Sequence, residues 1–551
     1  MTPSPRRPLV RRASTLATTL ATTLALAAGT AATASDTVPT PPTEGVDSLD
    51  PALATVQSLF TPVPVSASEP AREITMALRD LAGRYDTLDK ADRKVADAYL
   101  ARPTDDSDGD GFTIEYAVEE ATPVCTTDLC VHYVDAPTED DAPPLADRAD
   151  ARGVDGANGV PDYVDGVVRE LTTIHDTYLA AGYREPLPDR SLGGDDRFDV
   201  YLADIASRGA YGYCATDQPT PRGGQGRQSE ADRWAYCVLD NDYAEFAGSA
   251  LENLRVTAAH EYFHAVQFAY DAFEDQWFLE ATATWAEDEV FDEIDDNVQF
   301  LRRSPLTAPF VPLDSFVTSG VYDGFHYGTW SFLRFLTEKY RAEKGPMPRL
   351  VLDLLRKADG ARGAPDLYSW QAVAAVLKRR GTSAAEQFLA FSIANRDPRR
   401  RYAEGLAEHY PTGPLRGSMV LSPKRLHTRT DAETDHLTSA TYRFTPRRLD
   451  RPRTRLRVVL DMADRHRGSL AAVTVVPTRG KPFTREVSLS AKGNGRRSVP
   501  FSSRRVHHVE VTLANASARF GRCFEQYTPY SCRGLPKDDG LTQRIRVRVR
   551  R

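Results

Sequence analysis

Long apolar segments and a strong excess of charge are both missing from this chain of 551 residues. After the first 34 residues no stretch approaches the roughly 18 consecutive apolar residues that a membrane span needs, so no span is expected there. The net charge of -8 gives no general support for nucleic-acid binding. With 41% hydrophobic and 26% charged residues, the composition is that of a globular protein, and the length predicts several domains.

The nearly balanced total conceals an uneven distribution of charge. Residues 421–551 hold 29 Lys and Arg against 11 Asp and Glu, whereas residues 1–420 hold 40 against 66. The chain is therefore an acidic body followed by a basic region. In that region arginines alternate with apolar residues, as in 544–550, which predicts strands with one arginine-rich face. This face is either an ordinary solvated surface or a site for an anionic cell-envelope polymer.

The N-terminal residues predict export. Arginines precede a short apolar run over 16–28, and Ala32-Thr33-Ala34 offers a small-x-small cleavage site, so residues 1–34 are expected to be a signal peptide of a secreted protein. Arg11-Arg12 leaves a twin-arginine route open beside general secretion. Residues 35–104 are expected to be a leader and a helical extension, either a prosegment or an N-terminal packing element.

Cysteine is scarce, and the six present lie in three local pairs. In an exported chain an even number of cysteines predicts disulfides, and the simplest connectivity joins each pair, although other pairings are open. No C-x-x-C spacing occurs, so a cysteine-only zinc site is not indicated. The pairs are Cys125 with Cys130, Cys214 with Cys237, and Cys523 with Cys532.

Residue patterns predict an α+β fold in which the helices lie mainly in the middle of the chain. Alternating runs predict strands at 112–116, 130–134, 198–202 and 234–239 around a helix at 163–181. Helical periodicity predicts helices over 251–270, 276–290, 327–340, 348–357 and 383–394, the last with Ser383 as N-cap. After residue 410, short β-rich runs predict an appended β-sandwich.

An HExxH motif lies in the first of the long predicted helices. One helical turn separates His260 from His264, so both imidazoles can reach one metal ion while Glu261 lies beside it. Metal-assisted hydrolysis needs this arrangement, because the carboxylate takes a proton from a water that the metal acidifies. The apolar residues around the motif place it on a core-facing helix, which favours a zinc site over coincidence.

The third zinc ligand is expected on the next helix. A metzincin-like histidine is excluded, because Tyr270 occupies its position and Gln267 replaces the expected glycine. The following helix carries Glu280 near its start. Glu287, seven residues later on the same helical face, is a rival ligand, a partner of the histidines, or part of a solvated acidic end.

These residues resemble the gluzincins, zinc metallopeptidases whose third ligand is a Glu on the helix after HExxH. Trp277, Glu280, Ala281 and Ala283 match the pattern W-x-x-E-(G/A)-x-A, and over about thirty residues the chain is similar to a group of exported bacterial metalloproteases with a large N-terminal extension. The resemblance implies Zn²⁺ held by His260, His264 and Glu280. The expected catalytic unit spans 105–247 (α+β) and 248–415 (helical), and the basic β-sandwich spans 416–551.

Gluzincins also use a Tyr or His from a later helix to donate a hydrogen bond to the tetrahedral intermediate. The segment 320–330 offers Tyr322, His326 and Tyr327. Tyr327 resembles the family's "YG" position at a helix start and is the expected donor, with His326 next; either is equally explained as a packing residue.

Two acidic segments have incomplete ligand sets for calcium. Asp106, Asp108 and Asp110 occupy the first positions of a calcium loop, but its bidentate Glu is replaced by Ala117. The second set, Asp155, Asn158 and Asp162, either binds calcium or forms a turn before a helix capped by Asp162. Ca²⁺ therefore remains a second expected cofactor, with solvated turns as the alternative.

Two hypotheses for function follow. In the first, the protein is a secreted zinc metallopeptidase that acts on a protein or peptide substrate, with Glu261 as general base and then acid. In the second, the peptidase-like body is inactive and the secreted protein binds envelope or matrix through its basic β-domain. The intact Glu261 favours the first hypothesis.

Overall fold

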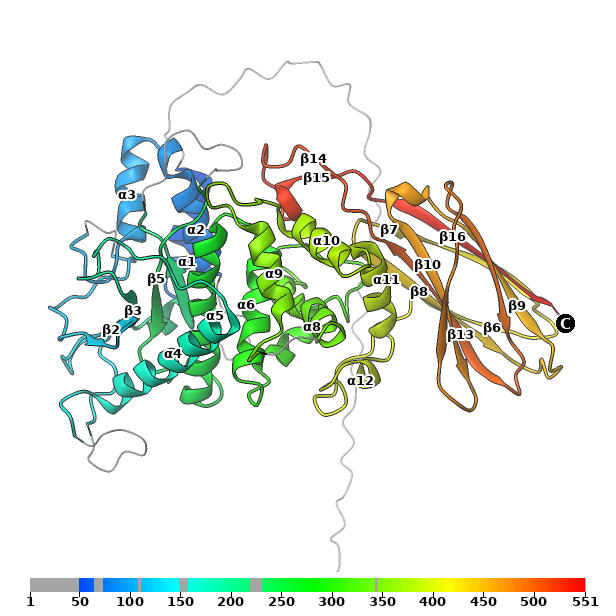
Figure 1. The fold of residues 1–551 in the computed structure, drawn as a ribbon, viewed down its shortest axis with the longest axis horizontal. Coiled ribbons are helices and arrows are strands. Elements are labelled where there is room, and N and C mark those ends of the chain that lie inside the picture. Colours follow the sequence, from blue (N-terminus) through cyan, green and yellow to red (C-terminus); the bar gives the residue numbers. More distant parts are fainter. Residues whose placement is uncertain are drawn as a thin grey trace, which may run out of the picture. The chain divides into compact units, whose positions relative to one another are not determined.

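The computed structural model describes residues 49–63, 73–107, 111–147, 157–218, 230–341 and 345–550. Residues from Leu49 onward form one compact unit of mixed α+β structure, with helices and several sheets (Figure 1). The expected signal peptide at 1–34 and the first part of the expected leader lie outside the described residues. No described helix combines the length and apolarity needed to cross a bilayer.

A five-stranded sheet lies in the N-terminal half, with the strand order β1-β2-β3-β5-β4. Strands β2, β3 and β5 run parallel, while β1 and β4 pair antiparallel at the two edges. The sheet is mixed, and β4 is an edge strand. The strands are β1 Val124–Cys125, β2 Leu129–His132, β3 Phe198–Ala203, β4 Gly212–Ala215 and β5 Tyr236–Asp240.

Helices cover both faces of this sheet. On one face α4 (Asp162–Ala181) and α5 (Ala250–Asp271) share a hydrophobic cluster with the strands. On the other face α1 (Pro51–Phe60), α2 (Ile74–Arg84) and α3 (Lys90–Leu100) bury a second cluster that includes Tyr213 and Tyr236. The described part of the N-terminal extension therefore covers one face of the sheet.

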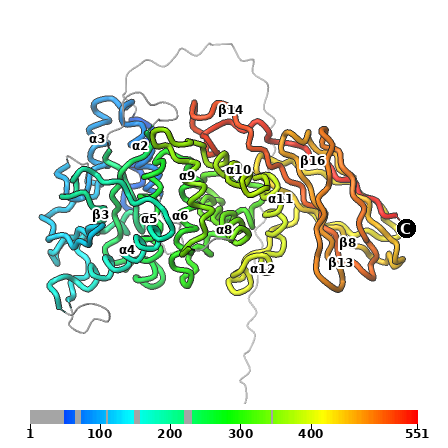
Figure 2. Tube along the Cα trace, viewed as in Figure 1, coloured from blue at the N-terminus to red at the C-terminus, as the bar shows by residue number. Residues whose placement is uncertain are grey.

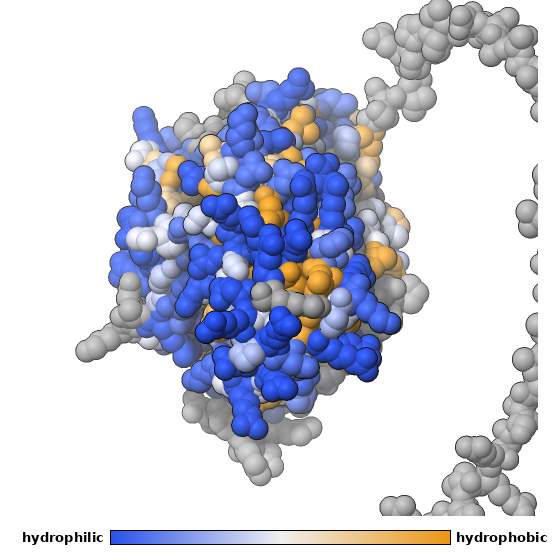
Figure 3. Space-filling view, turned by 90° about the vertical axis from the view of Figure 1, so that its right-hand side faces the viewer, coloured by the Kyte–Doolittle hydropathy of each residue, from blue (hydrophilic) through white to orange (hydrophobic). Residues whose placement is uncertain are grey.

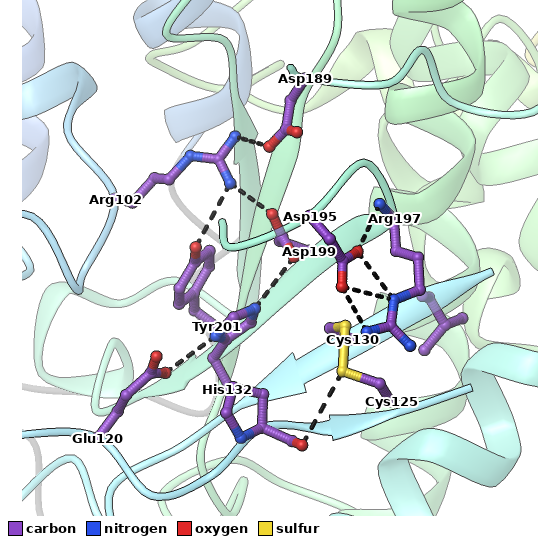
Figure 4. Close-up of polar contacts among 12 residues, drawn as sticks. Arg102, Glu120, Cys125, Cys130, His132, Asp189, Asp195, Arg197, Asp199 and Tyr201 are labelled. Carbon is purple, nitrogen blue, oxygen red and sulfur yellow. Dashed lines mark hydrogen bonds and ion pairs between the residues drawn. A yellow bond between two sulfur atoms is a disulfide. The ribbon is translucent and has the colours of Figure 1, made fainter. Parts of the chain in front are cut away.

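A buried ionic network joins the end of this extension to the sheet (Figure 4). Arg102, just after α3, contacts Asp189 at 2.6 Å and Asp199 at 2.5 Å, and all three side chains are buried. Asp199 also contacts Nε2 of His132 at 3.0 Å, and Glu120 contacts Nδ1 of the same ring at 2.9 Å. Because a buried guanidinium that loses its partners is costly, these contacts hold residue 102 against the sheet.

Helices dominate the middle of the chain, close to the expected positions (Figure 2). The helix α6 follows α5 after a short connection and packs against it. The predicted cap is confirmed, since Ser383 accepts from the Glu386 backbone and forms a capping box. The helices are α6 Gln276–Val290, α7 Phe325–Gly328, α8 Trp330–Lys339, α9 Arg349–Ala358, α10 Ser369–Arg379, α11 Ala384–Ala394 and α12 Pro398–Arg401.

The region after residue 416 is β-rich, as expected. One sheet has the order β11-β10-β13-β8-β6 and another β12-β9-β16-β7, and both contribute to one buried cluster. A short pair, β14 Phe520–Gly521 and β15 Leu535–Pro536, lies outside them. The other strands are β6 Gly417–Leu421, β7 His427–Thr434, β8 Thr438–Pro446, β9 Arg455–Asp461, β10 Ser469–Pro477, β11 Phe483–Glu486, β12 Asn494–Pro500, β13 Val506–Asn515 and β16 Leu541–Arg550.

The C-terminal region contacts the elements next to the HExxH helix. The indole nitrogen of Trp277 donates to Ser531 at 3.2 Å, and the backbone amide of Cys532 donates to Asp275 at 2.9 Å. Asp275 immediately precedes α6 and Trp277 lies in its first turn. The start of α6, which carries Glu280, is therefore supported by a loop from the end of the chain.

The structure corrects two of the expectations. Residues 112–116 do not form a strand; Ile114 and Tyr116 are buried, but Tyr116 uses its amide and hydroxyl to contact loop and strand carbonyls instead of a neighbouring strand. Asp162 is not a helix cap, because α4 begins at Asp162 with Pro161 at the N-cap position. An alternating apolar pattern such as that of 112–116 can therefore occur without a strand, and an acidic residue near a helix start such as Asp162 can lie inside the helix instead of capping it.

The cysteines form three local disulfides, Cys125–Cys130, Cys214–Cys237 and Cys523–Cys532, the simplest connectivity expected from their spacing. The second joins neighbouring strands β4 and β5 beneath α5. Disulfides persist in oxidising compartments, so these three fit an extracellular or periplasmic protein.

Candidate metal centre

Helices α5 and α6 bring the three predicted ligands together. His260 and His264 lie one turn apart on α5, and Glu280 lies in the second turn of the adjacent α6. The small residues Ala281 and Ala283 next to Glu280 are fully buried. Small side chains allow two helices to approach closely, and here that approach places a carboxylate beside two imidazoles.

The donor atoms of this group have the spacing of a tetrahedral zinc site. Nε2 of His260 lies 3.0 Å from Nε2 of His264 and 3.2 Å from Oε2 of Glu280, while Oε1 of Glu280 lies 3.3 Å from Nε2 of His264. Tetrahedral ligands at zinc bond lengths of about 2.0–2.1 Å lie about 3.3 Å from one another. The three residues therefore fit Zn²⁺ in both donor type and spacing.

The burial of Glu280 is a second argument for a cation. Its side chain and that of His264 are completely buried. Burial alone would raise the pKa of the Glu280 carboxyl, but the adjacent imidazoles outweigh burial and hold the pKa below its ordinary value. An ionised carboxylate in the interior needs a positive partner, and a metal shared with the two histidines supplies one.

The second nitrogen of each histidine is also held. Oε1 of Glu287 lies 2.5 Å from Nδ1 of His260, and Oε1 of Gln267 lies 2.7 Å from Nδ1 of His264. Gln267 in turn donates to the carbonyl of Leu279. With a proton on each Nδ1, both Nε2 lone pairs face the metal position. Glu287 is therefore placed as a partner of His260, and Glu280 faces both Nε2 atoms.

Glu261 lies between α5 and the edge of the five-stranded sheet. A Cβ added to Gly212 on β4 would come within 2.9 Å of Cγ of Glu261, so this edge strand passes directly over the carboxylate side chain. Burial raises the pKa of Glu261 above its ordinary value, although the neighbouring histidines oppose the shift. A carboxyl with a raised pKa beside the metal position suits a group that both accepts and returns a proton.

A residue that the sequence did not indicate, Thr75, contacts Glu261. Its hydroxyl donates to Oε2 of Glu261 at 3.1 Å and accepts from the backbone amide of Cys214 on β4 at 3.0 Å. Thr75 belongs to the first turn of α2, in the N-terminal extension. The extension therefore reaches both the predicted base and the edge strand.

A second residue of the extension contacts both predicted oxyanion donors. The hydroxyl of Tyr327 donates to Oε2 of Glu73 at 2.5 Å, and Nε2 of His326 lies 3.8 Å from the same oxygen. Nδ1 of His326 accepts from the Val317 amide at 3.2 Å, which leaves the proton on Nε2. The Tyr327 ring lies 6.0 Å from that of His260 between centroids. Burial raises the pKa of Tyr327 most, and the charge of the nearby Glu73 raises it further, so the hydroxyl keeps its proton and remains a donor.

The site is closed in this arrangement. His260 and Tyr327 are 9% exposed and Glu261 is 7% exposed. Glu73 and Thr75 lie over the face where the donors and the base converge. No sequence pattern marks these two residues, because Thr75 lies 186 positions from Glu261 and Glu73 lies 254 positions from Tyr327, on another predicted element.

The structure describes only part of the expected calcium sites. Asp108, Asp110 and Asp155 lie outside the described residues, and Asp106 is exposed. Asn158 accepts from the Val160 amide at 2.9 Å and donates to Asp165 at 3.0 Å, as in a turn before a helix. Asp162 is the first residue of α4. Calcium binding stays a prediction.

Comparisons with known proteins give no family for the chain. No family model matches it, and no curated protein sequence matches it. Among solved structures, the chain is similar to a periplasmic inhibitor of g-type lysozyme from Escherichia coli, with 9% identity and a TM-score of 0.14 over 24% of this chain and 98% of the inhibitor. It is also similar to the corresponding inhibitor from Aeromonas hydrophila, with 8% identity and a TM-score of 0.14 over 24% of this chain and 99% of that inhibitor. A family GH115 4-O-methyl-α-glucuronidase matches 67% of this chain and 53% of its own at 7% identity and TM-score 0.12. TM-scores this low carry no argument about fold or function.

Proposed function

We propose that this protein is an exported zinc-dependent metallopeptidase with a gluzincin-like catalytic unit and an appended C-terminal β-sandwich. The observation that carries the proposal is the 3.0–3.3 Å spacing among the two Nε2 atoms of His260 and His264 and the two carboxylate oxygens of Glu280, one facing each imidazole, with Glu261 on the same helix as the histidines. A core histidine pair packed for stability alone does not need two Nε2 atoms directed at each other and at a buried carboxylate.

The residues of this chain supply the steps around the metal. His260, His264 and Glu280 would hold zinc, which would supply a Lewis acid that makes a proton of the attacking water acidic near neutral pH. Glu261 accepts that proton and returns it to the leaving amine. Tyr327 and His326 donate hydrogen bonds to the oxygen that becomes negative as the carbonyl carbon turns tetrahedral.

The edge strand β4 offers a place for the peptide substrate. Strand β4 pairs with β5 along one edge only. The backbone amide of Cys214 on β4 donates to the hydroxyl of Thr75 and not to β5. An extended peptide that added to this edge would replace Thr75 as partner of the amide and would run past Glu261. For the peptide to bind in this way, Glu73 would also have to move away from Tyr327 and His326.

The decisive experiment is the substitution Glu261→Gln in the full chain loaded with zinc. It should keep one zinc per chain by elemental analysis, because Glu261 is not a ligand, and should lower cleavage of a peptide library by about 100- to 10,000-fold, the contribution of general base catalysis. Wild-type-like cleavage by Glu261→Gln would refute the mechanism. Absence of zinc from the folded wild-type protein would favour the inactive binding protein instead.

A further inference from the structure

The four-stranded sheet β12-β9-β16-β7 carries arginines on the outer side of every strand. In β16 buried and exposed residues alternate, so its arginines point outward while aliphatic residues fill the core. The same alternation holds in β7, β9 and β12. The resulting surface, here called the arginine face, consists of Arg429, Arg455, Arg457, Arg496, Arg544, Arg546, Arg548 and Arg550.

The register of the strands places like charges opposite each other. Arg546 on β16 is the direct partner of Arg429 on β7. On its other side β16 pairs with β9, where Arg548 lies opposite Arg457 and Arg550 opposite Arg455. Like charges directly opposite across strands destabilise a sheet. An ordinary solvated surface has no reason to repeat this arrangement three times, whereas a binding surface for anions does.

Acidic residues of the same face lie at its other end. Asp461 pairs with Arg544 at 3.7 Å and with Arg546 at 3.6 Å. The other six arginines of the face form no ion pair with a residue that the structure describes, and Arg455 bonds to Ser498 instead. The positive charge near the start of β9 and the end of β16 is therefore left without neutralisation by the chain.

We infer that the arginine face binds a linear phosphodiester polymer of the cell envelope. Along β16 successive outward arginines repeat every second residue, at roughly 6.8 Å, which presents a line of guanidinium groups to a chain with regularly spaced anions. Guanidinium groups bind phosphate oxygens in bidentate pairs. No Trp, Tyr or Phe lies among the outward residues of these strands, so the stacking platform of single-stranded nucleic-acid sites is missing.

The view in Figure 3 agrees with a polar contact surface. It looks onto the side at which β9, β16 and the C-terminus lie in Figure 1, and hydrophilic residues cover most of it, with smaller hydrophobic patches. This side of the molecule therefore does not present a broad apolar surface to a partner. The inference stands apart from the peptidase proposal, because none of these residues contributes to the metal centre.

The test compares two triple variants of the full chain with equal loss of charge. One is Arg546→Gln, Arg548→Gln and Arg550→Gln on the arginine face, and the other is Arg399→Gln, Arg400→Gln and Arg401→Gln on α12. Binding to purified poly(glycerol phosphate) is measured over a range of salt concentrations. We expect the face variant to bind at least tenfold more weakly with a salt slope smaller by roughly two, as for the loss of three phosphate contacts, and the α12 variant to bind as wild type does.

Stability and competing ligands complete the test. The face variant should melt at or above the wild-type temperature without polymer, because it relieves the like-charge pairs, so weak binding cannot be attributed to misfolding. Unchanged binding by the face variant would overturn the inference. Tighter wild-type binding to polygalacturonate, to single-stranded DNA or to phosphatidylglycerol vesicles than to the phosphate polymer would also overturn it.

Discussion

Substitution of Glu73 by Ser should open the metal centre. Glu73 caps α2 through its Oε1, which accepts from the Met76 amide at 3.2 Å, and contacts Tyr327 through its Oε2. Ser is as good an N-cap as an acidic residue, so helix α2 keeps its first turn. Its side chain is too short to reach Tyr327 or His326, so the contacts of Glu73 with these two residues are lost while the N-cap is kept.

The size of the effect follows from that contact. A hydrogen bond to a charged group contributes about 1.5–3 kcal/mol. Each 1.4 kcal/mol changes an equilibrium about tenfold, so the ratio of open to closed molecules should rise roughly 10- to 100-fold. The contact with His326 is longer, at 3.8 Å, and adds less. If closed molecules predominate in the wild type, kcat/KM should rise by the same factor.

Two measurements separate closure from catalysis. The affinity of the zinc-loaded protein for a small hydroxamate, measured by calorimetry, reports whether the metal is reachable, and cleavage of a peptide library reports turnover. Asp89→Ser is the matched control, since Asp89 caps the neighbouring helix α3 by accepting from Ala91 and Asp92 and is exposed. This control should leave both readouts unchanged.

The two readouts also give distinct failures. Equal hydroxamate affinity in Glu73→Ser and wild type would refute the closure by Glu73. Tighter hydroxamate binding without any peptide cleavage would support closure and count against the peptidase.

Two further predictions concern the metal centre and the ionic network that joins Arg102, Asp199 and His132. Glu287→Gln, which weakens the partner of His260, should lower zinc affinity about 10- to 100-fold in a competition with a chelating dye, while Glu293→Gln, at an exposed position nearby, should not. Burial opposes the charged form of His132, but its contacts with Asp199 and Glu120 raise its pKa above 6.5. The stabilising contribution of protonated His132 is therefore full below pH 6.5 and is lost as the pH rises through the raised pKa. The free energies of urea unfolding of wild type and of His132→Gln should therefore converge toward alkaline pH. A difference between them that stays constant with pH would contradict this.

The grouping of the candidate ligands could be predicted in part, because the spacing of the two histidines is local. His260 and His264 are four residues apart on one helix, so helical geometry directs both to one point. Glu280 is favoured over Glu287, on the same face of the next helix, because small residues beside it allow a close helix approach and because it matches the gluzincin pattern. Glu287 could not be assigned in the same way, because a helical face does not say which imidazole nitrogen a carboxylate meets. Only the coordinates place it at Nδ1 of His260.

The contacts of the N-terminal extension could not be predicted. Thr75 and Glu261 are 186 residues apart, and no periodic pattern links them. Apolar spacing predicts helices α2 and α3 of the extension, but it does not predict α1, which lies within the residues expected to be a leader, nor which sheet these helices cover. The arginine-rich strands were likewise predictable from alternation, whereas the opposition of Arg548 to Arg457 depends on a register that only the folded sheet defines.

The buried contacts of Arg102 bear on when the site becomes closed. Helices α2 and α3 belong to the core around the five-stranded sheet, and Arg102 holds their end against Asp189 and Asp199. The event that folds the core also delivers Glu73 to Tyr327 and Thr75 to Glu261. The covering of the site by Glu73 and Thr75 is therefore part of the same folded core that brings His260, His264 and Glu280 together, and not a later addition to it.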